Sequence, residues 1–232
     1  METSRDHMLA RIRAGLEPNR AMLADMAARA PHAPPPFVHP PQDDLSAQFA
    51  AELAKLEGYP HRCADDTQAL DAIRAILQRH QATSVVAWDR ALIGLPGLDA
   101  LLAELGTHVL DGDIIGVERT ARLGTLEPAP VCISGADAGI AESGTLVLRS
   151  GSGRARLASL IAPVHIAVLR RAQIVRGLGA ALALLQDQHG RDLFVDSSNL
   201  TLITGPSRTG DIELTLTLGV HGPREIHVVL ID

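Results

Sequence analysis

The chain has 232 residues, enough for one sizeable α/β domain with a small appendage. Hydrophobic residues make up 46% and charged residues 21%, a composition that excludes a disordered chain. The net charge of −6 and the aromatic content of 2% argue against nucleic-acid partners, which need a basic face or stacking platforms.

The two cysteines, Cys63 and Cys132, are far apart and form no C-x-x-C pair. Structural zinc and iron–sulfur clusters usually need three or four ligands at short spacings, so we expect no metal and no cofactor. The sequence has no disulfide framework, secretory signal or apolar run of membrane-spanning length. These features predict a soluble cytoplasmic protein without a membrane partner.

Residues 1–43 are predicted to form a helical arm and a connector. Ser4 can cap a first helix whose apolar stripe includes Met8 and Ile12, and a second helix is predicted for residues 21–30. The following PHAPPPFVHPP cannot form a regular helix or an inner strand. Such an arm suits docking on a partner or on a sister subunit of a homo-oligomer, and equally packing on its own domain.

Helix and strand patterns alternate through residues 44–232, the expected main domain. Helices are predicted after Asp44, after Asp65, and at residues 98–105, 174–185 and 212–218; strands are predicted at residues 84–88, 108–110, 146–148, 164–169, 200–204 and 226–231. Short apolar strands separated by helices predict an α/β fold with a mainly parallel sheet and helices on both faces. Functional residues are then expected at the carboxyl ends of the strands.

The segment ISGADAGIAESGTLVL is the first candidate site. Its small residues allow close approach of the backbone, and Glu142 lies beside an Ala-Ser-Gly turn that leads into an apolar strand. A carboxylate there can act as base, nucleophile or ligand anchor. The alternative is a turn carboxylate that holds a neighbouring loop.

The segment LTLITGPSRTGDIELTLTL is the second candidate site. A loop is expected to enter a helix near Asp211, where backbone N–H groups with Ser207, Arg208 and Thr209 suit a carboxylate or phosphate. The alternative is that Thr209 or Asp211 only caps the helix. The loop lacks the Lys-Ser/Thr ending of a Walker loop.

Two further features carry weaker signals. His221, beside Gly222 and Pro223, is expected to face a cleft, but no metal-ligand spacing links it to another group. The stretch GSGRAR at residues 151–156 is a basic loop that can close over an acidic ligand, or stay solvated.

Four stretches, in order, resemble the LUD-domain, lactate-utilization protein C (LutC/YkgG) family. They are ADAGIAESGTLVL at residues 136–148, LIAPVHIAVL at 160–169, ITGPSRTGDIE at 203–213 and LGVHGPREIHVVLID at 218–232. The resemblance implies a Rossmann-like fold of the NagB/RpiA/CoA transferase-like type, shared with sugar-phosphate isomerases and formyltetrahydrofolate cyclo-ligases. It also implies a role in oxidation of L-lactate to pyruvate, together with partner proteins that carry iron–sulfur clusters.

The same stretches select the predicted site residues. Glu142 is predicted to be catalytic, and a small carboxylate or acyl ligand is predicted to contact Ser143, Gly144, Thr145, Gly205, Ser207, Arg208, Thr209, Asp211 and His221. Two other functions stay open. One is a stand-alone acyl/CoA-transferase-like or cyclo-ligase-like enzyme, because Glu-Ser-Gly resembles the surroundings of the CoA-transferase nucleophile. The other is a non-catalytic scaffold of the lactate-oxidising complex.

Overall fold

The structure is a computed structural model that describes residues 4–28, 35–40, 42–114, 119–195, 197–210 and 216–232. The chain divides into two compact units, Met1–Pro34 and Pro35–Asp232. The first unit contains helices α1 (Ser4–Leu16) and α2 (Arg20–Ala28), separated by the 3-10 turn η1 (Glu17–Asn19) that contains Pro18. Both helices of the arm lie where the sequence predicts them.

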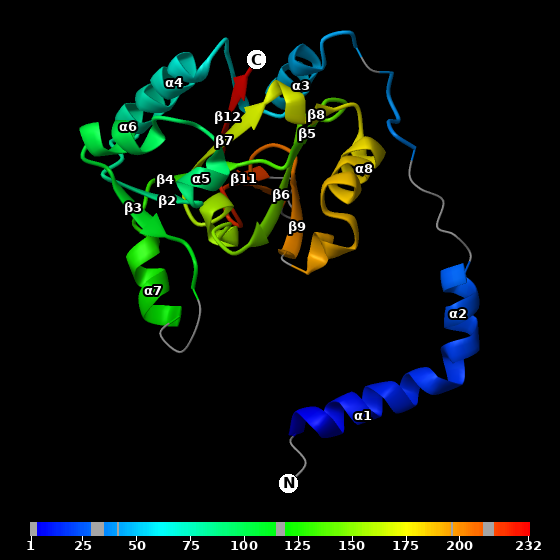
Figure 1. Cartoon of the computed structure of the whole chain (residues 1–232). Helices are drawn as coiled ribbons and strands as arrows, with labels where there is room; N and C mark the ends of the chain where they lie inside the picture. The colour runs from blue at the N-terminus through cyan, green and yellow to red at the C-terminus, as the bar shows by residue number, and fades with distance from the viewer. Residues whose placement is uncertain (1–3, 29–34, 41, 115–118, 196, 211–215) are drawn as a thin grey trace. The chain divides into compact units, whose positions relative to one another are not determined.

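A six-stranded parallel sheet forms the centre of the second unit (Figure 1). Its strands, in spatial order, are β1 (Tyr59–Cys63), β12 (Glu225–Ile231), β7 (Val164–Arg170), β4 (Val131–Gly135), β2 (Ser84–Ala87) and β3 (His108–Asp111). Every neighbouring pair in this sheet is parallel. The inner strands β12, β7, β4 and β2 are short and apolar because they are buried, and the α/β fold with a mainly parallel sheet is confirmed.

Helices connect the strands, and α3 and α4 begin at the caps that the sequence predicts. They are α3 (Leu45–Lys55), α4 (Asp66–Arg79), α5 (Arg90–Ile93), α6 (Leu98–Glu104), α7 (Arg119–Leu126) and α8 (Leu178–His189). Asp44 accepts hydrogen bonds from the first N–H groups of α3, and Asp65 does the same for α4. Among the described residues, no helix has the length and apolarity needed to cross a bilayer.

A second sheet has the order β8 (Ile174–Val175), β5 (Ala138–Ile140), β6 (Thr145–Gly151) and β9 (Ser197–Ile203), and α8 packs against it. The predicted strands at 146–148 and 200–204 therefore do not join the parallel sheet. The reason is the short turn between β5 and β6, because a parallel crossover needs a dozen or more residues. Ile174 is also a strand residue, so the helix predicted from there begins at Leu178.

A small hairpin, β10 (Arg208–Gly210) with β11 (Leu216–Leu218), corrects a second prediction. The prediction of a helix over residues 212–218 is wrong for its last three residues, because Leu216–Leu218 is a strand. The stretch IELTLTL alternates apolar and polar residues, which is the two-residue period of a strand. Residues 211–215, with the predicted site residue Asp211, lie outside the described residues.

Candidate functional site

The strand order reverses direction at β2, and this reversal creates a crevice at the carboxyl edge of the parallel sheet. From β2 the chain moves outward to β3 and then returns to form β4 on the other side of β2. Segments that leave β2 and β4 consequently diverge, and ligands of open α/β sheets bind in such crevices. The residues that follow these strands are Trp88 and Asp89 after β2, and Ala136 and Asp137 after β4.

Asp137 is the centre of a buried ion-pair cluster in this crevice. One carboxylate oxygen accepts from Arg149 Nε at 2.9 Å and from Arg154 Nη1 at 2.7 Å, and the other accepts from the Arg149 backbone N–H at 2.7 Å. The Asp137 and Arg149 side chains are only 6% and 10% exposed. Two guanidinium groups around one carboxylate leave the cluster with an excess positive charge.

The loop that follows β6 is fastened to the end of β2. Trp88 Nε1 donates to the Ala155 carbonyl at 3.2 Å, and the Asp89 N–H donates to the Gly153 carbonyl at 2.8 Å. The Arg154 guanidinium also lies 5.5 Å from the centre of the Trp88 ring, a cation–π contact. The basic stretch at residues 151–156 is therefore held in place by contacts with the parallel sheet's own loops.

A cavity of about 660 Å³ opens beside this loop, and we call it the arginine cleft. Its polar lining includes Asp113, Arg119, Ser150, Ser152, Arg154 and Arg156, and its apolar lining includes Ile114, Leu157 and Leu160. Arg119 and Arg156 are exposed and form no ion pair with any other described residue. Unpaired guanidinium groups beside a buried positive cluster can bind an anionic group through charge-assisted hydrogen bonds.

Glu142 lies in the turn between β5 and β6, away from the arginine cleft's lining. Its Oε2 accepts from the Val38 N–H at 2.7 Å and the His39 N–H at 2.9 Å, so it holds the connector. Burial acts to raise the pKa of Glu142, but hydrogen bonds from the N–H groups of His39, Val38 and Leu178 outweigh it and lower the pKa. The carboxylate is thus stabilised in its ionised form by backbone donors.

The residues after Glu142 form a chain of hydroxyl groups. Ser143 Oγ lies 2.7 Å from Thr145 Oγ1, which lies 2.8 Å from Thr204 Oγ1 at the end of β9. Gly144 has φ +59°, and a side chain there would collide with the Leu53 backbone of α3. Glycine at this position is explained by the close contact between the turn and α3.

The second predicted segment also contacts α3, at its carboxyl end. Gly205 has φ +83° and lies against Leu56, and Arg208 Nη2 donates to the Leu56 carbonyl at 2.6 Å and to Glu57 at 2.8 Å. Ser207 donates its N–H to the Pro223 carbonyl at 2.8 Å and accepts from the His221 N–H at 3.4 Å.

The structure therefore brings the two predicted segments together through the Thr145–Thr204 contact and α3. Within the described residues, Glu142 and Arg208 both have protein partners, and Thr209 is in β10. The expected helix N-terminus is not present at Arg208–Gly210, which is a strand. A catalytic role for Glu142 stays a prediction, as does a ligand role for Ser143, Gly144, Thr145, Gly205, Ser207, Arg208, Thr209 and His221.

Neither cysteine is suited to act as a thiolate. Burial raises the pKa of Cys132 to about 11, in spite of nearby backbone N–H groups. Burial, with Asp65 and Asp232, also raises the pKa of Cys63. Both thiols stay protonated near neutral pH, so neither is a ready nucleophile.

Sequence reasoning gave little weight to the residues of the arginine cleft. The stretch GSGRAR was the available signal, but its partners Trp88 and Asp137 are distant in sequence. Asp137 stood inside the first candidate segment, and its burial was not visible from composition.

An α/β protein with a parallel sheet and a cleft at the strand-order reversal is the class that this geometry defines. The LUD-domain family model matches residues 46–231. The chain therefore belongs to the LUD-domain family, and the resemblance seen in the sequence is confirmed.

Curated relatives agree with this assignment. The chain is 28% identical over 200 residues to lactate utilization protein C of Geobacillus sp. (strain WCH70), covering 82% of this chain and 80% of the relative. It is 31% identical over 164 residues to lactate utilization protein C of Oceanobacillus iheyensis, covering 69% and 68%. A crystal structure of a DUF162 family protein from Deinococcus radiodurans has the same fold, with a TM-score of 0.55 and 21% identity over 81% of this chain and 96% of that one.

Proposed function

We propose that this chain acts in lactate utilization, in the oxidation of L-lactate to pyruvate together with iron–sulfur partner proteins that carry the electrons. The observation that carries the proposal is the similarity to proteins named lactate utilization protein C, which extends over more than two thirds of the chain. The LUD-domain match over residues 46–231 supports it.

We place the ligand of this function in the arginine cleft. Lactate and pyruvate are carboxylates, and Arg119 and Arg156 offer guanidinium groups that are not paired with any described residue. The volume of about 660 Å³ is within the usual range of ligand pockets and exceeds the needs of a three-carbon acid. The cleft therefore also has room for a larger acyl compound that carries the carboxylate.

A scaffold function is the second candidate, and one observation favours it. Glu142 and Arg208 are occupied by contacts with the connector and with α3. These contacts argue against an acyl/CoA-transferase-like or cyclo-ligase-like enzyme, because a nucleophilic Glu142 would first have to release two backbone N–H groups.

Complementation of a deletion strain on L-lactate as the sole carbon source tests the proposal. The paired substitution Arg119→Ala with Arg156→Ala should impair growth, because each lost charge-assisted contact costs about 1.5–3 kcal/mol, or roughly ten- to a hundred-fold in affinity. Arg122→Ala is the matched control, since Arg122 lies on the same helix α7 and does not line the cleft. Circular dichroism checks that every variant is folded.

Each outcome separates the candidates. Full growth of the paired variant means that the cleft is not the ligand site. If Arg208→Ala or Glu142→Gln is folded but does not restore growth, the functional site lies in the two predicted segments. Growth of the deletion strain itself on L-lactate contradicts the role in lactate utilization. Affinity purification from lactate-grown cells should recover iron–sulfur proteins, and their absence contradicts the partnership.

A further inference from the structure

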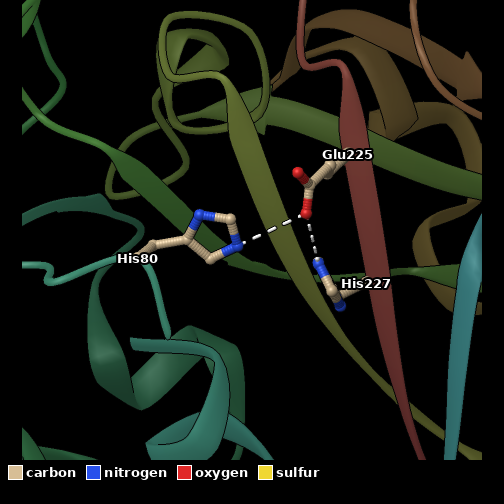
Figure 2. A group of neighbouring side chains, drawn as sticks. All are labelled: His80, Glu225 and His227. Carbon is tan, nitrogen blue, oxygen red and sulfur yellow. Dashed lines mark hydrogen bonds and ion pairs between the residues drawn. The ribbon is translucent and has the colours of Figure 1, made fainter. Parts of the chain in front are cut away.

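Three side chains meet near the amino edge of the parallel sheet, and none of them lines the arginine cleft. His80 is the residue at the carboxyl end of α4, Glu225 begins β12, and His227 follows two residues later on the same side of that strand. Figure 2 shows both imidazole rings directed at one carboxylate oxygen. One ligand atom from each residue lies within 4.8 Å of the other two.

Two of the three distances between ligand atoms agree with the geometry of a metal centre, and the third is within 4.8 Å. Glu225 Oε2 lies 3.3 Å from His80 Nε2 and 3.3 Å from His227 Nε2. In a tetrahedral site with bonds of about 2.0–2.1 Å, neighbouring ligand atoms are about 3.3–3.4 Å apart. The contact between His227 and Glu225 also meets the criteria of a hydrogen bond, slightly beyond the long end of the usual range of about 2.7–3.2 Å.

Hydrogen bonding within the described part of the protein does not explain why His80 Nε2 is buried. Among the described side chains, His80 Nε2 is one of the few buried polar atoms without a hydrogen-bond partner, and its contact with Glu225 lacks hydrogen-bond geometry. A buried polar atom without a partner is costly, and bound ions are one recognised explanation for such atoms.

His227 is held in the orientation that a metal ligand needs. Its Nδ1 lies 2.9 Å from His61 Nε2, and its ring stacks on Tyr59 with centroids 4.7 Å apart. When Nδ1–H donates to His61, the Nε2 lone pair faces Glu225. Metal-binding histidines commonly use their second ring nitrogen in this way, which fixes the tautomer and the ring orientation.

We propose that His80, Glu225 and His227 form a binding site for a divalent transition metal ion, with Zn²⁺ as the best-suited metal. Two imidazoles and one carboxylate are an established zinc ligand set that leaves a fourth position for water or another ligand. The side chains of His80 and Glu225 are 19% and 23% exposed, although His80 Nε2 itself is buried. The 2% exposure of the His227 side chain places the ion against the sheet.

Sequence spacing did not indicate this site. The expectation of no metal rested on the cysteines and on the lack of a histidine motif, whereas His80 comes from a helix end far from β12 in the sequence. Of these residues, only Glu225 and His227 are close together in the sequence. His61 lies beside them because β1 pairs with β12.

Zinc titration of the full-length, untagged protein tests the proposal. The protein is first stripped with a chelator, then titrated against a chromophoric zinc indicator, and the metal content is measured by elemental analysis. We expect one Zn²⁺ per chain. His80→Ala and Glu225→Gln should each weaken binding by more than tenfold, and His61→Ala by roughly ten- to a hundred-fold through loss of ring orientation.

His108→Ala is the matched control, because His108 is an exposed histidine at the start of β3, and it should leave zinc affinity unchanged. Co²⁺ gives a readout that needs no variant, since a four-coordinate site produces a strong visible absorption that six-coordinate aqueous Co²⁺ lacks. Two results overturn the proposal: wild-type protein without this absorption, or zinc affinity that is equal in wild type, His80→Ala and Glu225→Gln.

Discussion

Two charged regions of this protein show opposite arrangements of their functional groups. In the Glu142 turn, the carboxylate is occupied by N–H groups of the connector. In the arginine cleft, Asp137 is buried with two arginines, while Arg119 and Arg156 lie beside a cavity and form no ion pair with any residue that the structure describes. The first arrangement joins segments of the chain, whereas the second leaves donors available to a ligand. A dense run of small residues in a sequence can therefore mark close backbone contact as well as chemistry.

Removal of the Asp137 carboxylate is expected to have the largest effect. Asp137→Ala leaves the buried Arg149 without its partner, and the loss of one member of a buried pair typically costs about 3–5 kcal/mol. The loss of stability is measured as the change in the free energy of unfolding in urea. Asp99→Ala is the control, because it removes an exposed partner of Arg90 and should cost less than about 1 kcal/mol. If both variants lose the same free energy of unfolding, the buried ion-pair cluster does not stabilise the arginine cleft.

Gly144→Ala should have the next largest effect, in the turn region. The added methyl group meets the Leu53 backbone and also forces a positive φ, so we expect a loss of about 2–4 kcal/mol. Gly94 has φ +71° and open space around it, so Gly94→Ala should show only the strain of about 1–2 kcal/mol. If both alanine variants unfold at the same urea concentration, the close contact between the turn and α3 is unimportant.

Glu142→Ala should release the connector from the domain. Loss of hydrogen bonds from two backbone N–H groups to a charged acceptor costs about 1.5–3 kcal/mol, with the lower end expected because the site is partly exposed. Limited proteolysis should then cut the chain near residues 36–40 faster than in wild type. Glu52→Ala, which removes only a surface pair with Lys55, should leave the cleavage rate unchanged.

The smallest expected effect is a change of stability with pH that comes from His165. Burial, with a minor contribution from His227, lowers the pKa of His165 from its usual value near 6.5 to about 4. Between these values the unfolded chain binds more protons, so stability is complete above pH 6.5 and falls as the pH drops toward 4. We expect a loss on the order of 1–2 kcal/mol between pH 7 and pH 5 in the presence of a chelator. Burial also lowers the pKa of His227 to about 4, so His165→Gln should reduce this slope without removing it, and an unchanged slope assigns it to other groups.

The fold was largely predictable from the sequence, because buried parallel strands and helix caps leave local signals. Asp44 and Asp65 cap α3 and α4 as expected, and the apolar runs of β2, β7 and β12 are strands. β1 was missed, since YPHRC is polar and contains proline, and it is tolerated at the sheet edge. The division of strands between two sheets was also missed, because it depends on turn length and pairing that an apolar pattern does not specify.

The candidate site was less predictable, for a physical reason. The arginine cleft joins Trp88, Asp137 and Arg154 through side-chain contacts between distant segments. Whether a charged residue is free or paired depends on such contacts. Glu142 and Arg208 are residue types that binding sites use. Their contacts depend on the positions of the connector and of α3, which the sequence pattern does not specify.

The pairing of β1 with β12 has a consequence for how the protein folds. Tyr59 and His227 are partners across these strands, so almost the whole domain separates them along the chain. Within the described parallel sheet, β1 has β12 as its one neighbour and cannot find its place until β12 has been synthesised. Such distant parallel pairing is slow, because the loop entropy is lost before the contact forms. The sheet is therefore completed late, and until then the edge of β7 that pairs with β12 is unpaired and open to aggregation.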